Sequence, residues 1–287
     1  MIEMDSSDLI ESTVTSTRVR LARNLFSYPF PDKLDEKRAR EIIRVVGYEL
    51  NRLDTFTEYD IGKIEPDEAT FLLEKHLISP DLIRRKSISA AFITSDEEIS
   101  VMINEEDHLR EQYILRGCNL YKAYERISGI DDGIGRSVSF AYDEKLGYLT
   151  ACPSNLGTGM RASVMMFLPG LAKYKRLEEL MPSLKANGLT VRGVFGEGTA
   201  AEGYSYQISN ERTLGVSETD ILSLHRKARI AGVDVRRQHA DAHTLAFSGI
   251  LDHLSRVVQH ARQQGCHEFT WIMPFQISGL VCHHRIG

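Results

Sequence analysis

Five arginines in the sequence lie in or beside polar, turn-forming stretches. A guanidinium group suits bidentate contacts with phosphate oxygens. Two of the five alternate along the chain, which would place both on one face of a strand. A single arginine is more often solvated surface, but the set, together with glycine-rich loops and acidic residues, favours a site for phosphate groups. The five are Arg18, Arg20, Arg110, Arg161 and Arg192.

Two glutamates, Glu106 and Glu197, each lie where a strand is expected to meet a loop or a helix. Both also have a structural interpretation. Glu106 would lie in the first turn of a helix that contains Arg110, where its charge favours the positive end of the helix. Glu197 would be a turn residue between Gly196 and Gly198. Neither glutamate by itself identifies a reaction.

The stretch at 157–162 matches the dinucleotide-binding pattern G-x-G-x-x-A. A lone match of this kind is weak. The preceding residues, 152–155, do not resemble the end of a buried parallel strand, and the neighbouring hairpins do not suit a Rossmann unit. The chain also contains no Walker A, HRD or DFG sequence. The sequence around this match therefore disfavours dinucleotide binding.

Periodicity predicts both helices and strands around these residues. The helices are expected at 35–53, 66–76, 106–124 and 160–171. The β-rich runs predict hairpins at 88–103 and 140–151 and strands at 189–195 and 204–209. Residues 128–136 are expected to form a glycine-rich loop, and 217–220 resemble a helix capping box. Hairpins mixed with helices predict an α+β domain in which helices flank an antiparallel sheet.

The composition is typical of a folded protein, with 287 residues of which 42% are hydrophobic and 26% charged. The net charge of −5 excludes a bulk basic surface for nucleic acid. No apolar run approaches the ~20 residues of a membrane span, and the acidic first residues do not resemble a secretory signal. The four cysteines contain no CxxC pair. We therefore expect a cytoplasmic protein that binds neither nucleic acid nor membranes.

Four motifs, in the same order, resemble those of the phosphagen (ATP:guanidino) kinases. They are STRVRLARN at 16–24, NEEDHLR at 104–110, CPSNLGTGMRAS at 152–163, and GEG at 196–198 followed by YQISN at 206–210. The match covers roughly residues 13–218. Two further stretches, LFSYPFP at 25–31 and EKHLISP at 74–80, resemble the bacterial protein-arginine kinase branch of this family.

The resemblance implies a phosphagen-kinase type of catalytic domain and an ATP-dependent protein-arginine kinase. Glu106 is then the orienting base, Glu197 the clamp of the guanidinium group and a second candidate base, and Cys152 an auxiliary residue. Mg²⁺ would be held mainly by ATP and water, with no metal site built by the protein. A kinase of free arginine or another guanidino metabolite, and a catalytically dead nucleotide-binding homologue, are the alternatives.

The resemblance also implies an ATP site built from several segments. Its residues are Ser16, Thr17, Arg18, Val19, Arg20, His76, Arg110, Arg161, Ala162, Ser163, Val164, Met165, Arg192, Gly193, Val194, Phe195 and Gly196.

The C-terminal part of the chain differs from the rest. Eight of the ten histidines lie after Asp220, and the family motifs end near residue 218. We expect a catalytic domain at 13–245 and a histidine-rich tail of unknown role at 246–287. From the family we also expect protein substrates with exposed arginines, a zinc-binding activator protein, a link to a Clp-type protease, and a homodimer.

Overall fold

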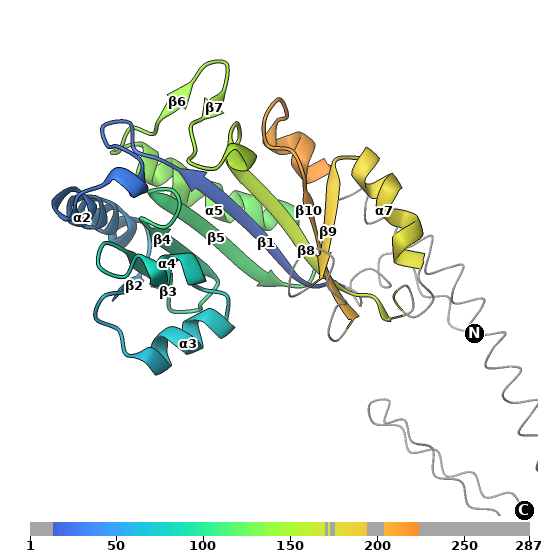
Figure 1. Cartoon of the computed structure of the whole chain (residues 1–287), viewed down its shortest axis with the longest axis horizontal. Coiled ribbons are helices and arrows are strands. Elements are labelled where there is room, and N and C mark those ends of the chain that lie inside the picture. Colours follow the sequence, from blue (N-terminus) through green and yellow to red (C-terminus); the bar gives the residue numbers. More distant parts are fainter. Residues whose placement is uncertain (1–13, 170–171, 173–175, 194–203, 224–287) are drawn as a thin grey trace, which may run out of the picture. The chain divides into compact units, whose positions relative to one another are not determined.

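The computed structural model describes residues 14–169, 172, 176–193 and 204–223, which contain one eight-stranded sheet (Figure 1). The strand order is β2-β3-β4-β5-β1-β8-β10-β9, and every neighbouring pair is antiparallel. This confirms the predicted antiparallel sheet of an α+β fold. The strands are β1 (Val14–Arg23), β2 (Phe56–Asp60), β3 (Ala90–Thr94), β4 (Ile99–Ile103), β5 (Leu109–Arg116), β8 (Met160–Phe167), β9 (Leu189–Gly193) and β10 (Ser205–Asn210). A separate hairpin joins β6 (Tyr142–Asp143) to β7 (Gly147–Tyr148).

Helices cover both faces of this sheet. The longer ones, α2 (Glu36–Leu53) and α5 (Leu120–Gly135), supply the larger hydrophobic core together with one face of the strands. The shorter α3 (Pro66–Glu74) and α4 (Pro80–Arg84) form a second core against β3 and β4. The two cores lie on opposite faces of the sheet, because successive side chains of a strand point to opposite faces. In β3, Phe92 belongs to the first core and Ile93 to the second. Further helical elements in the described residues include α7 (Arg176–Ala186) and two short 3-10 turns, η1 (Pro31–Lys33) and η2 (Pro153–Asn155).

Several predicted elements are confirmed. The helix expected at 35–53 is α2, whose N-terminus is capped by the Asp35 carboxylate, which accepts a hydrogen bond from the Arg38 amide at 2.8 Å. Both predicted hairpins are present, as β3–β4 and β6–β7. The capping box is also present: Asp220 N donates to Ser217 Oγ at 3.1 Å, and Ser217 N donates to the Asp220 carboxylate at 3.0 Å.

Two of the predicted helices are wrong, because both segments contain central strands. Residues 106–124 form a turn, then β5, and only then the start of α5. Residues 160–167 form β8, which pairs with β1 on one side and β10 on the other. Both strands are buried on their two faces, so the polar–apolar alternation that marks a half-exposed strand is weak.

The predicted loop at 128–136 is also wrong, since α5 continues through these residues to Gly135. Glycine disfavours a helix only mildly, and packing overrides that preference. Gly133 faces α2 so closely that an added Cβ would lie 2.5 Å from Cδ2 of Leu53. Gly133 therefore permits the close approach of α2 and α5.

No helix in the described part of the chain is both long and apolar enough to cross a membrane. The domain boundary predicted at 245/246 lies outside the described residues and stays a prediction.

Candidate active site

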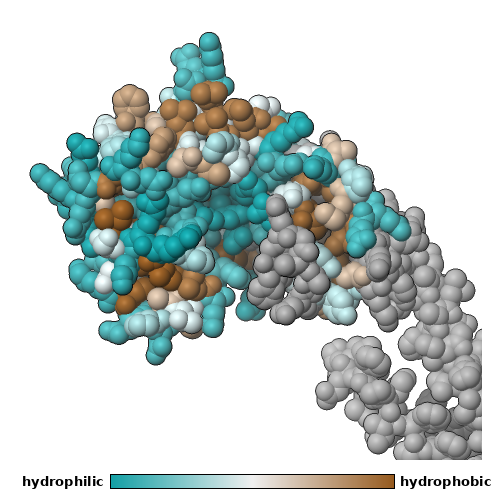
Figure 2. Space-filling model, in the orientation of Figure 1, coloured by the Kyte–Doolittle hydropathy of each residue, from teal (hydrophilic) through white to brown (hydrophobic). Residues whose placement is uncertain are grey.

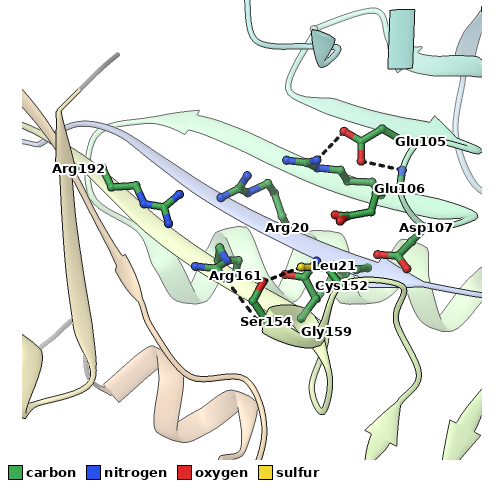
Figure 3. Close-up of a pocket in the computed structure, with 13 residues that line it drawn as sticks. Arg20, Leu21, Glu105, Glu106, Asp107, Cys152, Ser154, Gly159, Arg161 and Arg192 are labelled. Atoms are coloured by element: carbon green, nitrogen blue, oxygen red, sulfur yellow. Dashed lines mark hydrogen bonds and ion pairs between the residues drawn. The ribbon is translucent and has the colours of Figure 1, made fainter. Parts of the chain in front are cut away.

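The strand register brings the arginines onto one face of the sheet. Arg20 of β1 lies opposite Gln112 of β5 on one side and opposite Arg161 of β8 on the other. Ala22, two residues on, lies opposite Arg110. Figure 3 shows Arg20, Arg161 and Arg192 reaching toward a common space from three strands. In Figure 2 the middle of this face is hollowed and hydrophilic.

These arginines are held close together with few anionic partners. Within the described residues, neither Arg18 nor Arg20 forms an ion pair, and Nε of Arg20 is buried without a hydrogen-bond partner. Burial lowers the pKa of Arg18 to about 10, aided by the charge of Arg110. Burial, then the charges of Arg18, Arg110 and Arg161, also lower the pKa of Arg20. An anion bound here would relieve this repulsion, so the face is suited to phosphate groups.

Two further arginines of this cleft, Arg110 and Arg161, have partial partners. Arg110 Nη1 pairs with the Glu105 carboxylate at 2.5 Å. Within the described part of the chain, Arg161 makes long hydrogen bonds of 3.4 Å to the carbonyl oxygens of Asn210 and Ser154. Burial and the charge of Arg192 lower the pKa of Arg161. Both guanidinium groups line the same cleft as Arg20.

Carboxylates occupy the other end of the cleft. Residues 104–108 form the turn between β4 and β5, closed by a hydrogen bond from Asn104 N to His108 O at 2.9 Å. The expectation that Glu106 begins a helix is therefore wrong: it lies in a turn, and Arg110 lies on a strand. Glu106 is exposed and points into the cleft near Asp107 and Cys152 (Figure 3). Its partial burial, followed by the charges of Asp107 and Glu105, raises its pKa.

Buried hydrogen bonds fix this turn. The Asp107 carboxylate accepts from Asn24 Nδ2 at 2.6 Å and from the Ala151 amide at 2.7 Å. The His108 ring accepts from the Leu25 amide at 3.0 Å through Nδ1 and lies 2.9 Å from Pro29 O through Nε2. Burial lowers the pKa of His108 to about 4, so the ring is neutral, with Nε2 as the donor. The turn is thus attached to the chain that follows β1.

Cys152 lies across the cleft from Glu106. Its thiol is partly buried, and Sγ lies 3.1 Å from Oγ of Ser154. The thiol lines the same cleft as Glu106 and Arg161. A hydroxyl neighbour and nearby arginines give this thiol polar surroundings.

A second pocket lies on the far side of Arg18. His76 enters it from the loop after α3, and Met165 and Ile114 give it apolar surface. Burial, then the charge of Arg18, lower the pKa of His76. Ser16, Ser163 and Gln207 complete the lining with polar groups. Such a mixture suits a flat heterocycle with polar edges.

The structure distributes the predicted ATP residues over two faces. Ser16, Arg18, Arg20, His76, Arg110, Arg161, Ser163, Met165 and Arg192 line one of the two pockets. Thr17, Val19, Ala162 and Val164 are buried on the opposite face of the sheet, with the last three in the core behind it. Gly193 ends β9. The remaining predictions, Val194, Phe195, Gly196 and Glu197, lie outside the described residues.

Sequence reasoning missed several lining residues, which are Glu105, Asp107, Ser154, Asn155 and Gln207. The three consecutive acids at 105–107 could have indicated the acidic lining. The alternation of side chains along the strand at 204–209 could have indicated Gln207. Among the described residues, no group of three or more acids, histidines or cysteines is arranged to hold a metal ion.

Comparison with known proteins gives a consistent result. Residues 39–228 match the model of the ATP:guanido phosphotransferase family, C-terminal catalytic domain. The chain is 48% identical over 223 residues to the protein-arginine kinase of Clostridium acetobutylicum, covering 76% of this chain and 66% of that protein. It is 39% identical over 280 residues to the protein-arginine kinase of Caldanaerobacter subterraneus subsp. tengcongensis, covering 94% and 83%. The chain thus spans just under two thirds of the first of these relatives.

Solved structures with the same fold include two kinases. A structure of the duplicated taurocyamine kinase from Schistosoma mansoni with bound transition state analog components superposes with a TM-score of 0.70 at 29% identity, covering 81% of this chain and 34% of that one. A lombricine kinase structure superposes with a TM-score of 0.68 at 29% identity, covering 83% of this chain and 71% of that one.

Proposed function

Because this chain belongs to the ATP:guanido phosphotransferase family, we propose that it transfers the γ-phosphoryl group of ATP to arginine side chains of proteins. One observation supports this most strongly: a single cleft has clustered arginines at one end and Glu106 with Asp107 at the other. A nucleotide triphosphate suits the first end and a guanidinium group the second. The cleft therefore has complementary charge for both reactants.

In this proposal the arginines hold the phosphates and stabilise the charge on the transferring group. Bound Mg²⁺ would supply further charge neutralisation, carried mainly by the nucleotide and water. Glu106 orients the acceptor guanidinium in line with the γ-phosphorus and accepts a proton from the attacking nitrogen. An N–P bond forms as the bond between the γ-phosphorus and the bridging oxygen breaks, and ADP leaves. The raised pKa of Glu106 makes it a better proton acceptor than an ordinary carboxylate.

The other predicted residues have supporting roles in this proposal. The pocket with His76, Ser163 and Met165 takes the nucleoside, because it adjoins the phosphate end through Arg18. Glu197 clamps the acceptor with Glu106, and Cys152 assists from the opposite wall. The catalytic domain extends over 13–245.

The names of the relatives support a protein acceptor, since the curated matches with 39–48% identity are called protein-arginine kinases. We extend the proposal to a zinc-binding activator, a Clp-type protease pathway, a homodimer and a cytoplasmic location. These four points rest on the family resemblance.

The test is transfer from γ-labelled ATP·Mg to an arginine-rich protein and, in parallel, to free arginine. We expect label on protein that is lost in acid, because an N–P bond hydrolyses where a serine or threonine ester survives. Acid-stable label would overturn the proposal.

A free guanidino compound is the second candidate acceptor. The structural neighbours favour it, since they are kinases named for taurocyamine and lombricine. Label on free arginine alone would select this alternative, whereas ATP binding without transfer to any acceptor would select a catalytically inactive nucleotide-binding protein.

A further inference from the structure

Ser79 lies outside the cleft, yet its hydroxyl contacts a carboxylate that lies inside it. Ser79 is the N-cap of α4, where Oγ accepts a hydrogen bond from the Leu82 amide at 3.1 Å. The same Oγ donates to Oε1 of Glu105. Glu105 lines the cleft, and its side chain is only 1% exposed. The hydroxyl therefore connects a helix end to the floor of the site.

Glu105 connects the two ends of the cleft. Its Oε1 pairs with Nη1 of Arg110, at the phosphate end, at 2.5 Å. Its Oε2 accepts from the backbone amide of Glu106, at the guanidinium end, at 3.1 Å. Burial alone would raise the pKa of Glu105, but Arg110, followed by the hydroxyl of Ser79, lowers it. Glu105 is thus an ionised carboxylate that binds both neighbours.

We propose that Ser79 is a positioning residue for phosphoryl transfer, which acts through Glu105 to set the spacing of Arg110 and Glu106. This inference rests on the proposed function for its kinetic readout. Three groups bind the Glu105 carboxylate: the Glu106 amide lies in the same β4–β5 turn, Arg110 lies on β5 directly after it, and Ser79 lies at the start of α4. Ser79 is therefore the one of these three that holds Glu105 from a separate segment of the chain. Without the hydroxyl, Glu105 would keep only partners from its own turn and the strand that follows it.

Ser79 lies at the end of a loop that also supplies a residue of the second pocket. The loop between α3 and α4 carries His76 into the second pocket and Ser79 to Glu105. This loop is fastened to the sheet by Gln112 Nε2, which donates to His76 O at 2.7 Å, and by Ser100 Oγ, which donates to Leu77 O at 2.5 Å. One loop therefore lines the second pocket through His76 and reaches Arg110 indirectly, through Ser79 and Glu105.

Three substitutions separate the role of Ser79 as the N-cap of α4 from its role as the hydrogen-bond donor to Glu105. Ser79→Thr keeps the cap and the donor. Ser79→Asp keeps a good N-cap acceptor but replaces the donor by a carboxylate that repels Glu105. Ser79→Ala loses both. Ser100→Ala is the matched control, because it removes another buried serine hydrogen bond between the same loop and the sheet without touching Glu105.

We expect Ser79→Asp and Ser79→Ala to raise KM and Kd for ATP·Mg and to lower kcat/KM by about tenfold, the scale of one lost hydrogen bond to a charged group. Ser79→Thr should restore wild-type values. Ser100→Ala should lower Tm while KM and Kd stay at the wild-type level. The measurements are initial rates against ATP concentration, ATP·Mg binding by calorimetry, and thermal unfolding, all with the full chain.

The inference is overturned if Ser79→Asp and Ser79→Ala reduce only Tm or the active fraction, with KM and Kd unchanged. It is also overturned if Ser100→Ala changes Kd as much as they do. Absence of transfer by the wild-type chain would refute the proposed function alone, because the Kd comparison among the variants still tests how Ser79 positions Arg110.

Discussion

Arg20 and Arg23 lie three residues apart on β1 and have opposite surroundings. Arg20 faces the cleft and has no carboxylate partner among the described residues. Arg23 faces the core, where Nε and Nη2 contact both oxygens of Asp131 at 2.7–3.0 Å. Its Nη1 donates to two backbone carbonyls, and its guanidinium lies 3.6 Å from the centre of the Tyr148 ring. Burial lowers the pKa of both groups, but Asp131 outweighs it at Arg23 and raises the pKa there.

The difference shows that the face of the strand on which an arginine lies decides whether it stabilises the fold or is left to bind a ligand. An odd separation along a strand places two side chains on opposite faces. On the core face the fold supplies the counter-charge, so Arg23 stabilises the native state. On the cleft face the fold supplies none to Arg20, so a ligand must. Substitutions at the two positions should therefore change different quantities.

The largest effect on stability is expected from Arg23→Met. It leaves the Asp131 carboxylate buried without its partner, which costs about 3–5 kcal/mol in free energy of unfolding. Urea unfolding followed by circular dichroism measures this loss. The double substitution Arg23→Met with Asp131→Leu should recover most of it, because no unpaired charge is left. A loss below about 1 kcal/mol in the single variant would show that the pair is not structural.

Arg20→Met should have the opposite effects, with activity lost and stability kept. It removes a half-buried charge that has no carboxylate partner among the described residues, so the free energy of unfolding should stay constant or rise. The rate constant kcat/KM should fall by about 10²–10³, the scale for one group that stabilises transition-state charge. Arg116→Met, at the exposed end of β5, is the control and should leave both quantities unchanged. A stability loss in Arg20→Met equal to that of Arg23→Met would remove the distinction between the two faces.

The sequence was most informative where one face of an element is polar. The alternation of Arg18 and Arg20 predicted that both lie on one face of a strand, and α2 was predicted almost to its ends. The same reasoning failed at β5, where Gln112 is buried on the cleft face and Tyr113 on the core face. A strand that is buried on both sides lacks the contrast from which periodicity is recognised.

Contacts between distant segments could not be predicted. Ser79 and Glu105 are 26 residues apart, and their hydrogen bond depends on how α4 packs against β3 and β4. Gly133 was interpreted as a loop residue, because nothing nearby in the sequence reveals that Leu53 packs against it. Local propensity describes an element by itself, whereas these features arise from its neighbours.

Two glutamates extend the comparison, since Glu106 lies on the cleft side and Glu111 on the core side. Glu106→Gln should lower kcat by about 10²-fold without changing stability, because it removes the proposed proton acceptor. The acid limb of the pH profile of kcat/KM, which the raised pKa of Glu106 would place above the range of ordinary carboxylates, should disappear with it. Unchanged turnover would remove Glu106 from the mechanism.

Glu111→Gln should have the smallest effect, and that effect should be on stability alone. Both oxygens of Glu111 are buried without a hydrogen-bond partner in the described structure. Burial, then the charge of Asp131, raises its pKa well above the ordinary 4.5, against the opposing charge of Arg23. The folded state therefore holds this proton more tightly than the unfolded state, and its contribution to stability is lost as pH rises through the folded-state pKa.

Glu111→Gln cannot ionise, so it should unfold with a flatter pH dependence and gain about 1 kcal/mol at high pH. Urea unfolding across the pH range measures this gain. Glu125→Gln, which removes an exposed glutamate of α5, controls for the change in net charge. If the free energy of unfolding of wild type and of Glu111→Gln depended on pH in the same way, the prediction would be wrong. Arg23, already paired with Asp131, would then also neutralise Glu111, and the core face would hold two paired carboxylates instead of one.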